Sequence, residues 1–178
     1  MHIVQSKVKK ILYCITLILF FSDMGVYLYV DFKGAEKGIK SNLFSISLPN
    51  NLYPFVDNHS SFVLKDTNGI EVFGIGFRYA DMEFTIQDIL AYGYNKSSII
   101  VLCKFSEYEK LYVSYMNEYA MIDFREISCE KEQNAEYRWV KINNNDYYTY
   151  TRIKSWLLLL AIFLVILFFS EILKLRVK

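Results

Sequence analysis

The sequence predicts a membrane-anchored α+β protein, in which two transmembrane helices flank a small extracytoplasmic domain with a mainly antiparallel sheet and one short helix. Three observations support this prediction. Uncharged residues fill a long run near the C-terminus, a second apolar run near the N-terminus follows several lysines, and strand-like stretches lie between the two. A length of 178 residues leaves room for one domain of ordinary size beside the helices.

The second transmembrane helix is expected over residues 155–173. Residues 155–170 are sixteen uncharged residues in succession, and the run reaches nineteen residues at Leu173 when Glu171 lies among the headgroups. At about 1.5 Å per residue, nineteen residues cover roughly 28 Å, close to the thickness of the hydrocarbon core. A helix that is apolar on all sides does not suit the core of so small a soluble domain.

The first transmembrane helix is expected over residues 11–30, as an uncleaved anchor. A signal peptide is the alternative, because the basic segment Lys7–Lys10 precedes a short apolar run. Cleavage needs small residues, and the stretch FFSDMG offers Phe and Asp instead. Asp23 is the one ionisable residue of this helix. It lies past the bilayer midplane, where its insertion costs less than the roughly 2.5 to 3.5 kcal/mol expected at the centre.

Basic residues at both ends predict that both termini are cytoplasmic. They occur in the tails, residues 1–10 and 174–178, so residues 31–154 lie outside. This outer segment contains 14 Lys or Arg and 17 Asp or Glu, a net charge of −3, which argues against nucleic acid as a partner. The abundance of Asn, Lys, Ile and Tyr is typical of AT-rich bacterial genomes, so we expect a bacterial inner membrane and a periplasmic domain.

Linkers are expected on both sides of a domain of residues 43–142. Residues 31–42 carry charges and two glycines without an apolar period, and residues 143–154 begin with Asn-Asn-Asn-Asp. Within the domain, Phe44–Pro49 alternates apolar and polar residues. This alternation predicts a first short strand that ends at the proline.

A β-hairpin is the clearest local prediction. Ser61–Asp66 and Ile70–Tyr79 are rich in strand-forming residues and flank Asn68-Gly69, a pair that suits a type I′ turn. Gly74 and Gly76 indicate a bulge or close packing against a neighbouring strand.

A short helix is predicted next, over residues 85–93. Thr85 suits the N-cap, Asp88 three residues later gives an acidic variant of the capping box, and Gly93 suits the C-terminal stop. After the helix, Ser97–Phe105 has the density of β-branched residues of a buried strand.

Residues 106–122 fit either a helix or a hairpin. Tyrosines at spacings of four, three and four residues would share one helical face, whereas the density of Tyr and Val favours strands. We favour the hairpin, followed by strands at Ile122–Ile127 and Tyr137–Ile142. Tyrosine gives a large contact area at a low entropic cost, which makes these tyrosines a candidate interaction surface: Tyr108, Tyr112, Tyr115 and Tyr119.

Cys103 and Cys129 form a candidate disulfide, because both lie in the outer segment. Closing the loop between them would stabilise the domain by roughly 3 to 4 kcal/mol in the chain-entropy model. Two buried, reduced thiols are the alternative, since Cys103 lies in a strand-like run and free Cys is often buried.

The expected function is non-catalytic: an integral membrane protein whose outer domain binds another protein, in an accessory, assembly or immunity-type role. The sequence contains no HExxH, CxxC, Walker A or GxSxG motif. No catalytic residue, cofactor or metal site is therefore predicted. The expected partners are the lipid bilayer and another protein. The sequence is also compatible with a homo-oligomer.

Two alternatives to this function remain. Asp23 would suit a small pore or transporter subunit, because acidic residues within the membrane often line ion or proton paths. An enzyme acting on envelope material would use Asp57, His59 or a free thiol of Cys103 or Cys129.

Overall fold

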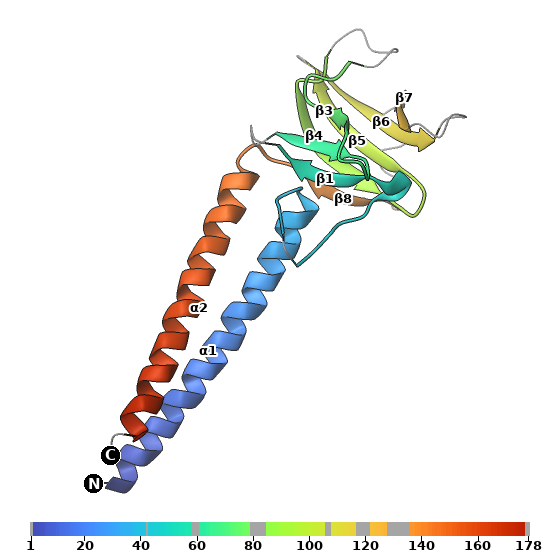
Figure 1. Ribbon diagram of the computed structural model, residues 1–178. Coiled ribbons are helices and arrows are strands. Elements are labelled where there is room, and N and C mark those ends of the chain that lie inside the picture. Colours follow the sequence, from blue (N-terminus) through green and yellow to red (C-terminus); the bar gives the residue numbers. More distant parts are fainter. Residues whose placement is uncertain are drawn as a thin grey trace. The chain divides into compact units, whose positions relative to one another are not determined.

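The computed structural model describes residues 2–41, 43–57, 61–78, 85–105, 108–116, 122–127 and 136–176, and Figure 1 labels its helices and strands. The chain divides into two compact units. The helical unit comprises Met1–Asp31 and Thr149–Lys178, and the sheet unit comprises Phe32–Tyr148.

The helical unit is an antiparallel pair of long helices, α1 (His2–Glu36) and α2 (Asp146–Arg176) (Figure 1). The rings of Tyr13 and Phe168 lie 4.7 Å apart near one end, and Lys154 forms an ion pair with Asp31 near the other. By length and composition, each helix is able to cross a membrane. Only 6% and 11% of their apolar windows are buried, so neither resembles the core helix of a soluble domain. The expectation of two long apolar helices at the chain ends is confirmed.

Both helices extend beyond the expected spans into the expected linkers. α1 continues through Glu36, so the first half of residues 31–42 is helical, and α2 begins at Asp146, so most of residues 143–154 is helical. Asp146 lies in the first turn of α2, where the positive end of the helix dipole favours an acidic side chain.

The sheet unit contains two antiparallel sheets. The three-stranded sheet has the order β1 (Tyr53–Val56), β2 (Phe62–Lys65) and β3 (Glu71–Gly74). The five-stranded sheet has the order β7 (Ile122–Ile127), β6 (Tyr108–Met116), β5 (Ile99–Phe105), β4 (Asp88–Tyr94) and β8 (Arg138–Lys141). The prediction of a mainly antiparallel sheet is confirmed, and its division into two sheets was not foreseen.

Aromatic side chains from both sheets form the core. Phe62 of β2 stacks on Tyr92 of β4 with ring centroids 5.3 Å apart. Phe73 of β3 lies 6.1 Å from the ring of Tyr112 and 4.3 Å from that of Phe124. One face of each sheet is therefore buried against the other sheet, which is the basis of a two-layer β architecture.

The predicted short helix over residues 85–93 is wrong, because most of this segment is strand β4. A register shift between Ile89 and Ala91 marks a β-bulge in its pairing with β5. The extra residue brings both Ile89 and Tyr92 into the core. Ile89 and Tyr92 are thus buried three positions apart within a strand, a spacing that also occurs on one face of a helix.

The predicted first strand, Phe44–Pro49, is also wrong. The burial of this segment alternates as expected, and Leu48 reaches the core. Its backbone joins no sheet, and a short 3-10 helix, η1 (Pro49–Asn51), follows it. An alternating pattern of apolar and polar residues indicates which side chains face the core. A β-strand also needs a neighbouring strand with which its backbone can form hydrogen bonds.

The hairpin prediction is confirmed for β2 and β3, which pair antiparallel, but the type I′ turn is wrong. Gly69 has a φ of +79° while Asn68 does not have a positive φ. The Asp66 carboxylate accepts hydrogen bonds from the main-chain N–H groups of Asn68 and Ile70, at 2.9 and 2.8 Å. This is a three-residue loop with glycine in the left-handed position. A Cβ on Gly74 would lie 2.8 Å from Val63 Cγ1, which confirms the expected close packing there.

The tyrosine-rich segment is a strand and not a helix, because Tyr108–Met116 is β6 and pairs with both β5 and β7. The hairpin predicted within residues 106–122 is therefore wrong for the described residues, which form one strand, and residues 117–121 lie outside the described ranges. The strands expected at Ile122–Ile127 and within Tyr137–Ile142 are present as β7 and β8. The sheet unit therefore contains more β-structure than an α+β prediction implies.

Candidate functional site

A group of charged side chains surrounds Glu36 at the end of α1. The side chain of Glu36 is only 3% exposed, and its Oε2 lies 2.8 Å from the Nζ of Lys33. Arg138 of β8 donates to the other carboxylate oxygen, Oε1. A buried carboxylate is stable only when it is paired, so the two cations make the burial of Glu36 tolerable.

The backbone beyond Glu36 forms a Schellman motif that ends α1. Gly38 has a φ of +80°. Its N–H donates to the carbonyl of Ala35 at 3.0 Å, and the N–H of Ile39 donates to the carbonyl of Gly34 at 3.0 Å. These bonds satisfy carbonyl groups that the helix itself leaves without partners. The sequence Lys-Gly-Ile carried this signal, which the linker interpretation missed.

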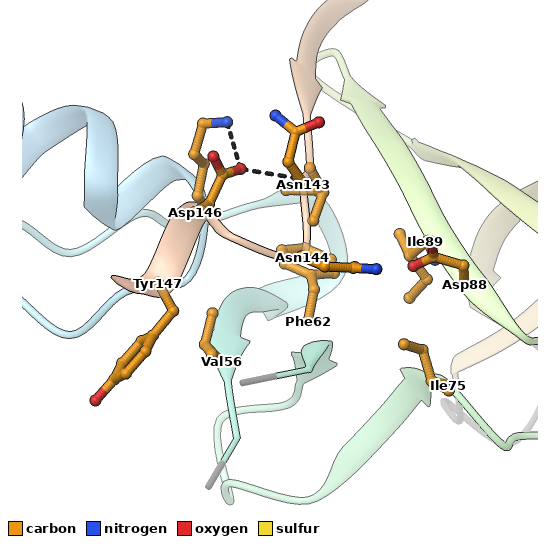
Figure 2. Close-up of a pocket in the computed structure, with 11 residues that line it drawn as sticks. Val56, Phe62, Ile75, Asp88, Ile89, Asn143, Asn144, Asp146 and Tyr147 are labelled. Atoms are coloured by element: carbon orange, nitrogen blue, oxygen red, sulfur yellow. Dashed lines mark hydrogen bonds and ion pairs between the residues drawn. The ribbon is translucent and has the colours of Figure 1, made fainter. Parts of the chain in front are cut away.

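Lys37 connects the end of α1 to the start of α2 and to β8 within the sheet unit. Its Nζ lies 2.6 Å from Asp146 Oδ2 and 2.7 Å from the main-chain oxygen of Lys141. Figure 2 shows that the Asp146 carboxylate also faces the backbone of Asn143, whose N–H donates to Oδ2 at 2.8 Å. The adjoining cavity, drawn in Figure 2, has a volume of about 10 Å³. This is room for one water molecule and not for a ligand.

The hydroxyl of Tyr92 donates a hydrogen bond to the main-chain carbonyl of Glu36. Tyr92 is fully buried on β4, so this bond joins the five-stranded sheet to the last turn of α1. Burial raises the pKa of the Tyr92 hydroxyl, and the neighbouring Tyr94 and the negative charge of Glu36 raise it further. The hydroxyl is therefore a permanent donor at physiological pH.

Replacing Tyr92 with phenylalanine is expected to lower the free energy of unfolding by about 1 to 3 kcal/mol, because the Glu36 carbonyl would lose its buried donor. Above the ordinary tyrosine pKa of about 10, the unfolded chain releases this proton while the folded chain keeps it. Stability should therefore fall by up to about 1.4 kcal/mol per pH unit from Tyr92 alone. Denaturant unfolding of the full chain in detergent, followed from pH 8 to 11, measures both effects.

Tyr148→Phe is the matched control, because the Tyr148 side chain is exposed. It should change neither the free energy of unfolding nor the alkaline slope. An equal slope for Tyr92→Phe and the unaltered protein would contradict the assignment of that slope to Tyr92.

An open groove lies beside the Glu36 group, with a volume of about 160 Å³. We call it the basic groove, because four of its seven residues are cationic. It is lined by Lys33, Glu36, Lys37, Arg138, Trp139, Val140 and Lys141. No local pattern predicts this groove, because Glu36 and Arg138 are separated by 102 residues and meet only because β8 pairs with β4.

The four tyrosines of the candidate interaction surface do not share one face. Tyr112 is 1% exposed and belongs to the core, whereas Tyr115 lies on the opposite face of β6 because side chains alternate along a strand. Tyr108 is exposed near the start of β6, and Tyr119 lies outside the described residues.

Tyr115 is the centre of a small, partly exposed cluster on β6 and β7, which we call the Tyr115 cluster. Its hydroxyl donates to Asp123 Oδ2 at 2.6 Å, and this bond raises the pKa of Tyr115. Arg125 donates to the same hydroxyl, and its guanidinium lies 4.5 Å from the centre of the Tyr115 ring. The ring is thus held in one orientation.

Asp23 is buried in the helical unit, with 6% of its surface exposed. Neither of its carboxylate oxygens has a hydrogen-bond partner among the residues that the structure describes. Among the α2 residues whose burial the structure describes, Ala161 and Leu164 are buried. The contacts that join the two ends of the helix pair put Asp23 near the level of Ala161, where α2 has no polar side chain.

Of the residues named for the enzyme alternative, Asp57 and Cys103 lie within the described ranges. Cys103 is a buried free thiol in the core, and burial raises its pKa, which does not suit a nucleophile. Cys129 lies outside the described residues, so the disulfide with Cys103 stays a prediction. His59 lies outside them as well, and the Asp57 carboxylate accepts a hydrogen bond from the N–H of Ser61 in a local turn. Within the described ranges, no three acidic, His or Cys residues are placed to hold a metal ion.

Comparison of the chain with protein-family models, with curated proteins and with solved structures finds no match.

Proposed function

We propose that the chain is a two-span integral membrane protein that presents the sheet unit on the extracytoplasmic side, where the unit binds another protein without catalysis. The observation that carries this proposal is the exposure of large apolar side chains around both helices. Ile18, Leu19 and Phe21 point in different directions around α1, and all three are at least half exposed. Such surfaces would aggregate in water and are stable in lipid.

The proposed orientation places both termini in the cytoplasm of a bacterial cell. The basic tails, residues 1–10 and 174–178, support it through the positive-inside rule. Retention of α1 as an anchor is supported by its course as one helix through residues 20–25, the stretch in which cleavage would fall.

Labelling of single cysteines tests the orientation. In a cysteine-free background, Glu136→Cys should react with a membrane-impermeant maleimide in intact cells, whereas Lys178→Cys should react only after permeabilisation. Glu136 is exposed in the sheet unit and Lys178 ends the cytoplasmic tail. The reverse pattern would contradict the orientation, and release of the protein by alkaline carbonate would contradict the two spans.

Protein binding is supported by the Tyr115 cluster. Tyrosine and arginine are enriched at the energetic centres of interfaces, and a ring that is already fixed loses little entropy on binding. Asp123 and Arg125 hold Tyr115 in this way.

A photoreactive amino acid at residue 115 tests this role in living cells. We expect a crosslink to one partner of defined mass, and none from the same group at Lys104, which is exposed on β5. Arg125→Ala should weaken the crosslink several-fold while the protein level stays constant. Equal crosslinking from both positions would contradict a specific surface.

A further inference from the structure

β8 is the last strand of the five-stranded sheet, and among the described residues it pairs with β4 alone. Directly after β8, the N–H of Ile142 donates to the carbonyl of Leu90 at 2.9 Å. The direction of hydrogen bonding alternates along an antiparallel strand, so the main-chain groups of Trp139 and Lys141 point away from β4. The Lys141 carbonyl agrees with this direction, because it accepts a hydrogen bond from Lys37 Nζ.

The outer edge of β8 therefore offers three main-chain groups without a partner among the described residues: the N–H and carbonyl of Trp139 and the N–H of Lys141. Such an edge is a template to which an extended segment of another chain can add as a further strand.

The basic groove follows this edge. All four residues of β8 line the groove, although neighbouring side chains on a strand project to opposite faces. What the four residues share is the edge of the strand. The other lining residues, Lys33, Glu36 and Lys37, belong to the sheet unit as well, so the groove lies within one compact unit.

The charge of the basic groove indicates which kind of segment suits it. The four cations outnumber Glu36 and the carboxylate of Asp146, which pairs with Lys37, and the net charge is +2. The C-terminal end of α1 adds a partial negative charge of about 0.5, which reduces this excess without cancelling it. Arg138 and Lys141 are both exposed and project to opposite faces of β8. Acidic side chains on either face of an added strand would therefore be favoured.

The same charges disfavour a second copy of the chain as the occupant. Two β8 strands paired edge to edge would bring two basic grooves together, and like charges on paired strands are destabilising. Cationic side chains on a short edge strand commonly prevent self-association in this way. An acidic segment of another protein does not meet this repulsion.

We propose that an acidic segment of a partner protein adds in an extended conformation to the outer edge of β8, as a sixth strand of the five-stranded sheet. Its main chain bonds to Trp139 and Lys141. This inference goes beyond the proposed function by assigning a second binding surface and the chemistry of its ligand. It depends neither on the membrane spans nor on the Tyr115 cluster, because β7 is the opposite edge of this sheet.

Fluorescence anisotropy of short labelled peptides, titrated with the full chain in a non-ionic detergent, tests the site. The acidic probe alternates glutamate with valine, the basic probe alternates lysine with valine, and both have blocked termini. We expect saturable binding of the acidic probe, about tenfold weaker binding of the basic probe, and a loss of affinity at high salt.

Two substitutions of Lys141 separate charge attraction from strand addition. Lys141→Gln removes the charge and should weaken binding of the acidic probe about threefold. Lys141→Pro also removes the outward N–H and should weaken binding about a further fivefold. This N–H does not bond to β4, so the unfolding temperature without peptide should stay nearly constant. The control, Lys104→Gln, removes an exposed charge on β5 and should change nothing.

Hydrogen exchange of single amides, followed by NMR, adds a measurement that charge attraction alone would not change. Binding of the acidic probe should slow exchange at Trp139 and Lys141 and leave the amides of β7 unaffected. Equal binding of both probes, equal binding by Lys141→Pro and Lys141→Gln, or unchanged exchange at Trp139 would each overturn strand addition. If Lys141→Pro unfolds at a lower temperature, the exchange experiment on the unaltered protein decides. Crosslinking at residue 115 and carbonate extraction do not involve β8, so failure of this site is distinguishable from failure of the proposed function.

Discussion

Replacing Gly38 with alanine is expected to destabilise the sheet unit by about 3 kcal/mol or more. A Cβ at this position would lie 2.6 to 2.8 Å from three backbone atoms of Phe55, and backbone cannot move aside as a flexible side chain can. The φ of +80° adds conformational strain for any residue with a Cβ. Overpacking and strain each cost on the order of 1 to 3 kcal/mol.

Gly38 also connects α1 to the three-stranded sheet. Its carbonyl accepts a hydrogen bond from the N–H of Val56 at 2.9 Å, so a shift of β1 away from Gly38 would break this bond. The same shift would disturb the end of α1, where Glu36 gathers the cations of the basic groove.

Gly76→Ala is the matched control, because Gly76 has a φ of +83° but nothing within 4 Å of a Cβ. Gly76→Ala should lower the free energy of unfolding by only about 1 kcal/mol, because the backbone conformation alone is unfavourable for alanine. Denaturant unfolding of the three full-length proteins in the same detergent measures the difference. If Gly38→Ala is no less stable than Gly76→Ala, the contact with Phe55 does not restrict this position.

Structural features that depend on residues close together in the sequence were predictable. The length of an apolar run determines whether a helix can span a bilayer, so α1 and α2 were predictable. β5 was predictable too, because its dense run of β-branched residues specifies a buried strand without knowledge of its partners. The Lys-Gly-Ile sequence after α1 was also local, and it would have located the end of this helix at Gly38.

Structure that depends on distant pairing was not predictable. The bulge in β4 arises from the pairing of β4 with β5. Without knowledge of this pairing, Ile89 and Tyr92 have the three-residue spacing of one face of a helix. The basic groove depends on the pairing of β8 with β4, which brings Arg138 to Glu36. Likewise, the pairing of β6 on both sides buries Tyr112 in the core and leaves the Tyr115 cluster partly exposed.

Replacing Asp23 with leucine is expected to stabilise the helix pair of a single chain by up to about 3 kcal/mol. An acidic side chain in a membrane segment costs roughly 2.5 to 3.5 kcal/mol at the bilayer centre. Asp23 recovers little of this cost, because neither carboxylate oxygen has a hydrogen-bond partner among the described residues. Unfolding of the full chain in mixed micelles, titrated with dodecyl sulfate, measures the change.

The same substitution distinguishes a pore from an anchor. In an anchor, Asp23→Leu should leave crosslinking at residue 115 unchanged, and Asp23→Asn, which keeps the size and removes the charge, should give an intermediate stability. In a pore or transporter subunit, or in a homo-oligomer held together by this residue, Asp23 meets a donor from another chain, and its loss would destabilise the assembly. Since α2 has no polar side chain at the level of Asp23, a destabilising Asp23→Leu requires a donor from outside the chain and would contradict the anchor.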